Sequence, residues 1–537
     1  MAGKAHVPRH KALEPAGVQG VRVIRSDVGA AGALGDGLHD DTGPVLATIA
    51  GVRDAGGGEV VFPPGTYRLS GSLPAYSGIT YRGAGMALST LQFHGGGYDA
   101  FVDGEGATGD SPMADTAWRD LGLDGSALAA APGKGVYVQH MLHPRWERVL
   151  VQNFPSTGFG ADFLADAVFA YCRAEGNGRL EEVNDPGGAG IGIGTGASSV
   201  EHSLVVGCRC VGNRTWGIFF ELQKKSTPRR RSVGNRVVDC YLVSNGFGVG
   251  DAGSAGLEVS GCTIARNSYE GVTVNHGSAQ GLGIPGEGGL IAENIVGGDG
   301  RHGIWLDYTD AEGKGPARYV VRNNIVTGSG GSGICVTGGQ ESVRDISLIG
   351  NELVGSGGSG IDCRAGPGGL RDLVVQGNRV YRNGAGNGQP QILLSGPFSR
   401  PRLLDNLVCA EGGTGRGIDL TDVTSLDALV AGNDVRGVAE GIVGGERLGE
   451  ASRVERNPGH APPPPCPLDM RPDAAAGPLR HRAGIRPEDV YISGGTQVVT
   501  MLDGQVLFSG PGLARLGPGE TIQVTWTAPP HVTVRVR

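Results

Sequence analysis

Long apolar runs are missing from this chain of 537 residues. No stretch approaches the ~18 consecutive apolar residues that a membrane-spanning helix needs. The opening "MAGKAHVPRHKALEPAG" carries charge but lacks the apolar core of a secretory signal peptide. The sequence therefore predicts no membrane partner and no classical signal peptide. A cytoplasmic location stays open.

A metal-like cysteine spacing and an excess of positive charge are also missing. The nine cysteines follow no zinc-ligand spacing, and we expect them to be reduced and mostly buried. Cys208 and Cys210 lie two apart, which predicts that both face the same side of a strand. The formal net charge is -8, and the cations form no extended stripe, which argues against a nucleic-acid partner.

Glycine, in contrast, is abundant, with 99 residues, and it accompanies a repeat. A short asparagine-containing element recurs with a nearly constant step at Asn324, Asn351, Asn378, Asn406 and Asn433. Short alternating runs such as "HGIWLD" and "SGIDCR" follow these elements, and alternation with a period of two is typical of strands. Stacking such coils buries a continuous apolar column.

Coils of about 27 residues leave room for three short strands and three turns. The expected fold class is therefore all-β, as a right-handed parallel β-helix. Asparagines at matching turns are interpreted as structural, because amides can hydrogen bond along the stack. The same phase is assigned upstream to Cys208, Asn235 and Cys262, which follow one another at the same step.

The N-terminal segment reads as a cap for the open end of the helix. In "GDGLHDDTGPVLATIAGVRDAGGGEVVFPPGTYRLSG", Asp41 or Thr42 can begin an α-helix with Pro44 in its first turn. Val45, Ile49 and Val52 would form its apolar face. The motifs "GDGLHDDT" and "GGGEVVFPPGTYRLSG" resemble the opening of the pectate-lyase-like superfamily, which is common in phage tail spikes and polysaccharide-degrading enzymes.

The resemblance implies a parallel β-helix, a polysaccharide substrate and a homotrimer as the expected oligomer. It also implies that Asp36, Asp40 and Asp41 are structural rather than catalytic. The expected organisation is a flexible arm over 1–20, a cap with the first coils over 21–110, and the β-helix over 111–457. A linker rich in proline and alanine over 458–484 and a small β-sandwich-like module over 485–537 complete it.

Function is expected on outward side chains and long loops, since the interior of a β-helix is filled by aliphatic stacks. Polar and aromatic residues become more frequent at the outward positions between Glu221 and Tyr308. The insertions 222–232, 277–289 and 309–317 leave the coils at the same edge. Together they predict a groove. The candidate catalytic residues are Glu221, Asp251, His276 and Asp307. The candidate substrate-binding residues are Phe219, Lys224, Lys225, Arg229, Arg230, Arg231, Asn275, Trp305, Tyr308 and Arg364.

Glu221 and Asp307 are expected three coils apart, about 14 Å, which is too far for a glycosidase pair. Glu221 with Asp251, and His276 with Asp307, would lie on adjacent coils. His276 or Tyr308 could move a proton, and the loop cations could attract an anionic polymer. The alternatives are that Asp307 only caps a loop, that His276 is a solvated turn residue, and that the cationic loop is merely solvated.

Several family hallmarks are missing: the Asp-Pro-His motif of alginate epimerases, the aspartates of calcium pectate lyases and the paired aspartates of polygalacturonases. The resemblance therefore names no catalytic residue and no cofactor, and no motif supports Ca²⁺. The expected function is binding and cleavage of an anionic polysaccharide, by a lyase or a glycoside hydrolase. A non-catalytic glycan-binding tail protein or adhesin, and a sugar epimerase or intramolecular transferase, are the alternatives.

Overall fold

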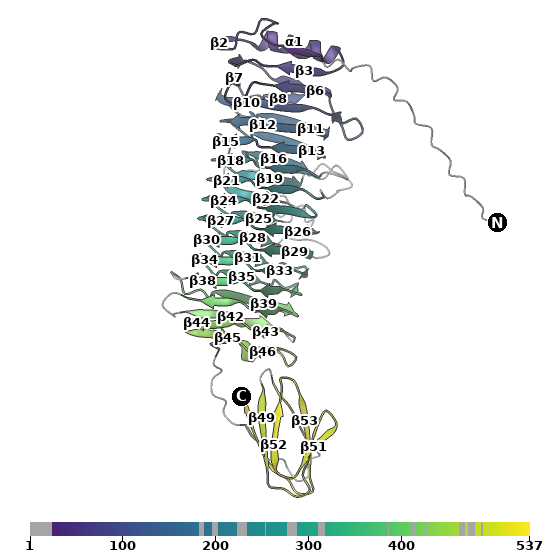
Figure 1. The fold of residues 1–537 in the computed structure, drawn as a ribbon, viewed down its shortest axis with the longest axis vertical. Coiled ribbons are helices and arrows are strands. Elements are labelled where there is room, and N and C mark those ends of the chain that lie inside the picture. The colour runs from purple at the N-terminus through teal and green to yellow at the C-terminus, as the bar shows by residue number, and fades with distance from the viewer. Residues whose placement is uncertain are drawn as a thin grey trace, which may run out of the picture.

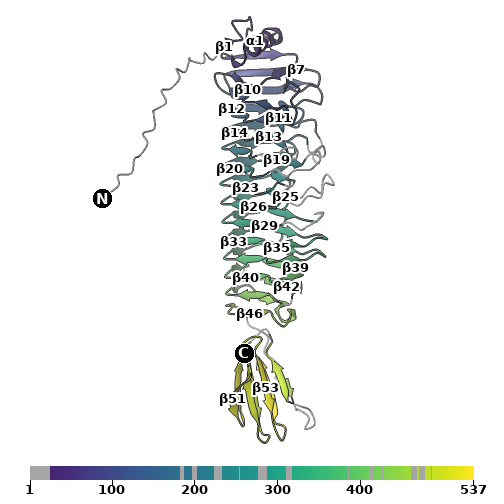
Figure 2. The ribbon, with the colours of Figure 1, turned by 90° about the vertical axis from the view of Figure 1, so that its right-hand side faces the viewer.

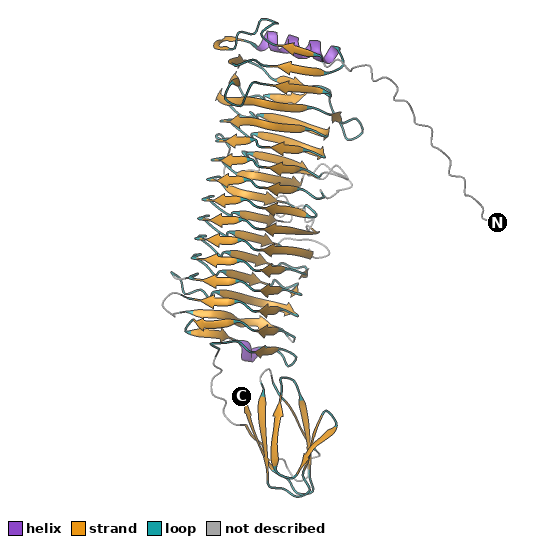
Figure 3. Ribbon diagram, in the orientation of Figure 1, coloured by secondary structure: helices purple, strands orange, loops and turns teal. Residues whose placement is uncertain are grey.

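The computed structural model describes residues 24–181, 187–195, 202–222, 233–252, 254–275, 287–309, 317–384, 386–410, 415–425, 427–460, 468–470, 478–484 and 487–536. Short parallel strands stack into a long column, with one α-helix at its N-terminal end (Figure 1, Figure 3). The column keeps this appearance after a quarter turn (Figure 2). The expected all-β class and the parallel β-helix are confirmed, with about 13 turns.

Each regular coil contributes two short strands to one sheet, sheet A, and one strand to a second sheet, sheet B. The strands of sheet B are β5 (Leu73–Ala75), β8 (Phe101–Asp103), β9 (Met113–Ala114), β11 (Val136–Leu142), β13 (Phe159–Ala165), β16 (Ile191–Thr195), β19 (Trp216–Leu222), β22 (Phe247–Asp251), β25 (Val272–Asn275), β28 (Ile304–Asp307), β31 (Ile334–Thr337), β35 (Ile361–Arg364), β39 (Ile392–Ser399), β42 (Arg416–Thr424) and β45 (Glu440–Val443).

The strands of sheet A in the central coils form two parallel series. The first series is β14 (Val168–Ala170), β17 (Leu204–Val206), β20 (Arg236–Val238), β23 (Leu257–Ser260), β26 (Glu287–Ala292), β29 (Ala317–Arg322) and β33 (Ser347–Ile349). The second is β15 (Arg173–Glu175), β18 (Arg209–Val211), β21 (Tyr241–Val243), β24 (Thr263–Ala265), β27 (Ile295–Gly297), β30 (Ile325–Thr327) and β34 (Glu352–Val354).

Stacked aromatic rings fill the interior of the first coils, and the later coils are filled mainly by aliphatic side chains, with single buried rings such as Tyr308 and Tyr319. Trp118 stacks on Trp146 with ring centroids 5.1 Å apart, and Trp146 stacks on Phe169 at 4.3 Å. Strand pairing continues this column into Val205 and Val237. The apolar core therefore runs unbroken along the axis, as stacking of coils requires.

A ladder of buried polar side chains follows one turn of the coil. Asn294 donates from Nδ2 to Oδ1 of Asn324 at 2.9 Å, and Asn324 donates in the same way to Asn351. The ladder continues through Asn378, Asn406, Asn433 and Asn457. The structural interpretation of these asparagines is confirmed.

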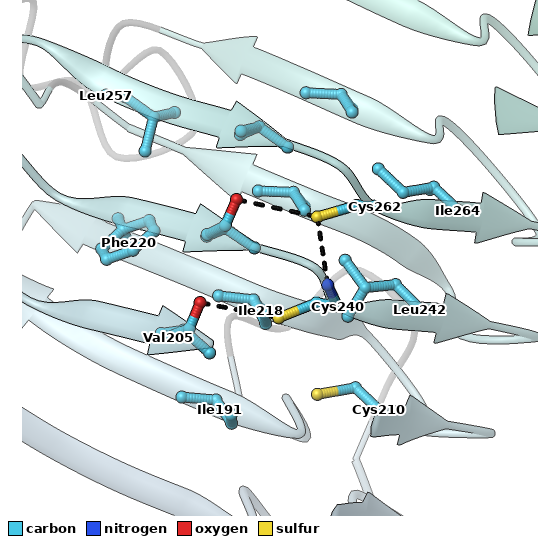
Figure 4. Packing of buried hydrophobic residues seen from close by; sticks show 14 of the residues in the cluster. Ile191, Val205, Cys210, Ile218, Phe220, Cys240, Leu242, Leu257, Cys262 and Ile264 are labelled. Carbon is cyan, nitrogen blue, oxygen red and sulfur yellow. Dashed lines mark hydrogen bonds between the residues drawn. The ribbon is translucent and has the colours of Figure 1, made fainter. Parts of the chain in front are cut away.

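Upstream of Asn294, cysteines occupy the same turn, namely Cys172, Cys208, Cys240 and Cys262. Figure 4 shows two of them, with the backbone N–H of Cys240 donating to the sulfur of Cys262. The phase assigned to Asn235 was wrong. Its side chain accepts a hydrogen bond from the backbone of Ser203 at another corner, and Cys240 takes the expected place. The eight described cysteines are free, and all but Cys409 are buried. Cys208 and Cys210 both face the interior, as expected.

The N-terminal cap contains α1 (Thr42–Asp54), whose buried face includes Val45, Ile49 and Val52, as predicted. Asp41 does not cap the helix through its side chain, because its carboxylate accepts N–H bonds from Leu34 and Gly35. Asp36 and Asp40 likewise bind local turns. The three acids are therefore structural, as the resemblance implied. Across the described part of the chain, no helix has the length and apolarity of a membrane span.

The C-terminal module consists of two antiparallel sheets of four strands. One contains β47 (Leu468–Met470), β54 (His531–Val536), β49 (Glu488–Ser493) and β52 (Gly512–Leu516). The other contains β48 (Leu479–Arg482), β53 (Thr521–Thr525), β50 (Val499–Leu502) and β51 (Gln505–Ser509). Strands β47 and β48 pair within these sheets although they fall in the segment expected to be a linker, so the module begins earlier than predicted.

Candidate functional site

The outer face of sheet B carries the predicted outward positions. Phe219, Trp305 and Asp362 lie in one outward column, which strand pairing connects through Gly250, Thr273 and Cys335. Gly250 lies opposite Phe219, so this coil contributes no side chain to the first column. Asp307, Thr337 and Arg364 share the second outward column. The pairing of β19, β22, β25 and β28 places Glu221 and Asp307 three coils apart, as predicted.

The pairing of Glu221 with Asp251 as two catalytic carboxylates was wrong. Asp251 lies opposite Phe220 and Val274, both of which face the interior, and its side chain is buried. Its carboxylate accepts the backbone N–H of Ser254, 3.1 Å away. Because neighbouring residues of a strand alternate between its faces, Asp251 and Glu221 lie on opposite sides of sheet B.

Tyr308 was expected on the groove wall, but it lies in the core with 1% of its surface exposed. Burial raises the pKa of its phenol well above the usual range, and the carboxylates of Asp251 and Asp307 raise it further. A ring in this position cannot touch a polysaccharide on the outer face. The substrate-contacting role assigned to Tyr308 is therefore contradicted by its burial.

Asp307 closes the turn that follows β28. Its Oδ1 accepts the backbone N–H of Thr309 at 3.0 Å, and the hydroxyls of Thr309 and Thr337 at 2.6 Å and 2.9 Å. Trp305 points outward, as predicted, and donates from Nε1 to the hydroxyl of Thr337 at 3.0 Å. These contacts support the alternative interpretation of Asp307 as a cap.

Phe219 and Arg364 are less available than expected. The ring of Phe219 stacks nearly parallel on Trp216 at 4.6 Å and is buried. Trp216 stacks in turn on Phe247 at 4.0 Å, so these rings cover one another's faces. Arg364 donates to both oxygens of the buried Asp362, at 3.0 Å and 2.8 Å. The outward position of Arg364 is as expected, but its charge already has a partner.

The other predicted positions lie outside the described residues. These are His276, Lys224, Lys225, Arg229, Arg230 and Arg231. The backbone of Asn275 pairs with Asp307, but its side chain also lies outside the described set. The three insertions that would form the walls of the groove are outside it as well, apart from the residues at their ends. The predicted groove therefore stays a prediction.

A carboxylate pair that the sequence reasoning missed lies nearer the N-terminus. Gln139, Asp162, Gly194 and Glu221 occupy one outward column on four consecutive strands, β11, β13, β16 and β19. Asp162 and Glu221 are thus two strand spacings apart, about 10 Å along the column. Only Gly194, which has no side chain, lies between the two acids.

Two N–H donors fix the carboxylate of Asp162. Gln139 donates from Nε2 to Oδ2 at 2.7 Å, and the backbone N–H of Gly194 donates to Oδ1 at 3.0 Å. A methyl group at position 194 would overlap that Oδ1, so the carboxylate needs glycine beneath it. These two donors hold the carboxylate in one orientation on the outer face, and a general base needs such fixed positioning.

Further polar side chains lie near Asp162. Gln139 also donates to the hydroxyl of Tyr137 at 3.2 Å, and the Lys134 ammonium lies 4.0 Å from the centre of the Tyr137 ring. Burial raises the pKa of Tyr137, and the charges of Asp162 and Asp99 add to the shift. Burial lowers the pKa of His140, although the nearby Asp162 opposes the shift.

A usable signal for Asp162 was present in "FGADFLA", where one acid stands in an alternating apolar strand. The coil length hid its neighbours, because no asparagine marks the turns upstream of Asn294 in that ladder. Metal ligation finds no support: among the described ranges, no three His, Cys, Asp or Glu residues are arranged to hold an ion. Whether the protein binds Ca²⁺ therefore stays untested.

Comparisons with known proteins agree with the fold. Residues 26–120 match the family model of rhamnogalacturonase A/epimerase, pectate lyase-like. The chain is 33% identical over 102 residues to mannuronan C5-epimerase AlgE4 of Azotobacter vinelandii, and 38% identical over 104 residues to AlgE5. Each match covers 18% of this chain, but only 18% of AlgE4 and 10% of AlgE5.

The tailspike protein of Escherichia coli bacteriophage HK620, solved in complex with a pentasaccharide, superposes with a TM-score of 0.51 at 11% identity. That alignment covers 93% of this chain and 90% of the tailspike chain. At this identity the likeness concerns the fold alone, which it extends along most of the chain.

Proposed function

Because residues 26–120 match the family model of rhamnogalacturonase A/epimerase, pectate lyase-like, we propose that this chain is a polysaccharide-active enzyme. The reaction is cleavage of a glycosidic bond on the outer face of sheet B. Glu221 is the proton donor to the leaving sugar, and Asp162 is the base that activates a water molecule. The substrate is a polysaccharide, and the cations at 224–231 favour an anionic one.

The carboxylate pair carries this proposal. Inverting glycosidases separate their two carboxyl groups by roughly 6.5–9.5 Å so that a water molecule fits beside the sugar. Two strand spacings give about 10 Å, and side-chain rotation can bring the oxygens into that range. Because Gly194 has no side chain, the Asp162 carboxylate extends over it towards Glu221. The hydrogen bonds from Gln139 and Gly194 to Asp162 support its assignment as the base.

The test uses the single variants Asp162→Asn and Glu221→Gln with a panel of acidic and neutral bacterial polysaccharides. New reducing ends measure hydrolysis, ultraviolet absorbance of unsaturated ends measures elimination, and NMR follows the anomeric configuration. Each variant should lose at least about 100-fold in rate, because it removes one proton-transfer group. Asp307→Asn is the matched control and should cleave at the wild-type rate. Wild-type cleavage by either acid variant would refute the pair.

Epimerisation is the second candidate, because the curated sequence matches are mannuronan C5-epimerases. Lys134, Tyr137 and His140 lie beside Asp162 and offer a cation and two proton-transfer groups for a uronate. Incorporation of deuterium at a sugar carbon without chain cleavage would favour epimerisation. Binding without any product would favour a tail protein or adhesin that only holds glycan.

The remaining aspects of the proposal concern assembly and place of action. Tailspike-like architecture favours a homotrimer that acts outside the host cell, on a virion or free. Sedimentation equilibrium of the full chain tests the oligomeric state. A monomer at micromolar concentration would contradict the proposed homotrimer. The catalytic pair does not depend on this outcome, since Asp162 and Glu221 belong to one chain.

A further inference from the structure

A second ladder of buried side chains runs through the turn that precedes sheet B. It contains Asn177, Asn213, Asn245, Asn267 and finally Asp299. In each step the side-chain oxygen of one residue accepts both the backbone N–H and the Nδ2–H of the residue one coil earlier. At the last step, Asn267 donates both bonds to Oδ1 of Asp299, each at 2.9 Å.

Each asparagine in this ladder also uses its amide nitrogen to reach a backbone carbonyl. Nδ2 of Asn213 donates to the carbonyl of Ala174 at 2.9 Å, and Nδ2 of Asn245 donates to Cys210 at 3.0 Å. Asn267 repeats the contact with Leu242 at 3.4 Å. These carbonyls lie in register on successive coils, and the next in the series belongs to Ile264.

Asp299 has an oxygen where the asparagines have an amide nitrogen. Its side chain is buried, and Oδ2 has no hydrogen-bond partner within the described residues. A carbonyl oxygen only accepts hydrogen bonds, and so does an ionised carboxylate. Two facing acceptors without a proton between them would be costly in a buried turn. Only the protonated acid can make the contact that Nδ2 makes in the earlier coils.

We propose that Asp299 is protonated in the assembled ladder, with Oδ2–H donating to the carbonyl of Ile264. We call the contact between Asp299 and the carbonyl of Ile264 the joint of the ladder. This hydrogen bond is lost when Asp299 ionises. The joint lies directly before β28, which carries Trp305 and Asp307 on the outer face of sheet B.

The charged surroundings of this joint favour the neutral acid. Glu270, which precedes β25, is also buried, and neither of its oxygens has a hydrogen-bond donor among the described side chains. Arg301 approaches Glu270 only to 3.9 Å, and Asp307 is a second negative group near it. Towards Asp299 itself, the ladder presents the neutral amide of Asn267, and Glu270 is the charged neighbour.

The titration of both acids agrees with this geometry. Burial raises the pKa of Asp299 to about 7, and the nearby Glu270 adds to the rise. Burial also raises the pKa of Glu270 to about 7, against the opposing charge of Arg301. An acid with a raised pKa in the folded state holds its proton more tightly there than in the unfolded chain. The stability that these two acids contribute should therefore be fully present below about pH 4 and be lost as pH rises through about 7.

The experiment compares urea unfolding of the full chain with that of Asp299→Asn between about pH 5 and about pH 8. The amide in this variant restores the N–H donor that the earlier coils have. At the upper pH, the variant should therefore unfold at a higher urea concentration than the wild type. Over this range the unfolding equilibrium constant of the wild type should rise roughly 100-fold more than that of the variant. An equal pH dependence in both proteins would overturn the proposal.

Two further variants distinguish the ionisation of Asp299 from other causes of a pH-dependent stability. Glu270→Gln removes the neighbouring acid, and the pH dependence that survives in it belongs to Asp299. Asn351→Asp is the matched control, because Nδ2 of Asn351 donates to the carbonyl of Val321 at 2.9 Å in the asparagine ladder. This change should create a new loss of stability on the alkaline side. If Asn351→Asp unfolds identically at both pH values, a buried ladder acid does not act as such a joint.

Discussion

The two halves of the outer face of sheet B differ in how their side chains are arranged. In the N-terminal half, glycines separate the functional side chains: Gly160, Gly192 and Gly194 lie between Tyr137, Asp162, Phe219 and Glu221. In the C-terminal half, every coil from Trp305 to Arg364 carries a side chain that bonds to a neighbour or packs beneath one.

The surroundings of Asp162 and Asp307 illustrate this difference between the two halves. Asp162 is held by donors on the two adjacent coils, while the strand on which it lies continues past it. Asp307 ends its strand and accepts three hydrogen bonds at a single oxygen. A carboxylate that closes a turn stabilises the coil, whereas one positioned on an open strand beside glycines can meet a substrate. Burial and donor count, rather than residue type, distinguish the two.

The largest expected effect comes from filling a glycine in the N-terminal half. Gly194→Ala places a methyl group on the present position of Asp162 Oδ1, so the carboxylate must move. Cleavage should fall by about 100-fold or more, since misplacing a catalytic group by about 1 Å has that cost. The rate of reducing-end formation measures it.

Gly192→Ala is the matched control on the same strand. A methyl group there meets Cγ2 of Thr157 at 3.3 Å and no carboxylate within 4 Å. This variant should keep its rate within a few-fold of the wild type. Equal losses in both variants would mean that backbone strain, rather than the position of Asp162, explains the effect.

A smaller effect is expected from removing the cap in the C-terminal half. Asp307→Ala deprives Thr309 and Thr337 of their shared acceptor, which should lower the free energy of unfolding by roughly 1–3 kcal/mol. The folded fraction should still cleave at the wild-type rate. Urea unfolding and cleavage, measured on the same sample, distinguish a loss of stability from a loss of catalytic rate. Asp307→Asn keeps an oxygen acceptor and should recover most of the stability, and a lasting loss of cleavage in it would assign Asp307 to the site.

The sequence predicted the fold better than the site, for a reason visible in the ladders. From Asn324 onward the coils have nearly constant length, so one period defines both strands and turns. Upstream, Cys208, Cys240 and Cys262 share a turn although the second coil between them is much shorter than the first. Spacing alone therefore assigned Asn235 to that turn.

The same irregularity explains the error in the candidate site. Strand β22 continues through Asp251, so alternation turns this side chain to the interior instead of placing it beside Glu221. Alternation within each strand was predicted correctly, as Trp305 demonstrates by pointing outward. Alignment between strands was not, because it depends on loop lengths that no local pattern encodes. Asp162 was missed for that reason, since its partner Glu221 is distant in the sequence and two loops of unequal length separate them.

The smallest expected effect tests the hydrogen-bonded network around Trp305. Trp305→Phe keeps an aromatic ring on the outer face but removes the Nε1–H that donates to Thr337. The hydroxyl of Thr337 retains its contacts with Asp307 and Thr309, so no buried group is left without a partner. The free energy of unfolding should therefore fall by only about 0.5–1 kcal/mol, which urea unfolding can resolve. A loss as large as that of Asp307→Ala would mean that the indole holds the turn, and that the C-terminal half is organised around Trp305 rather than around the carboxylate.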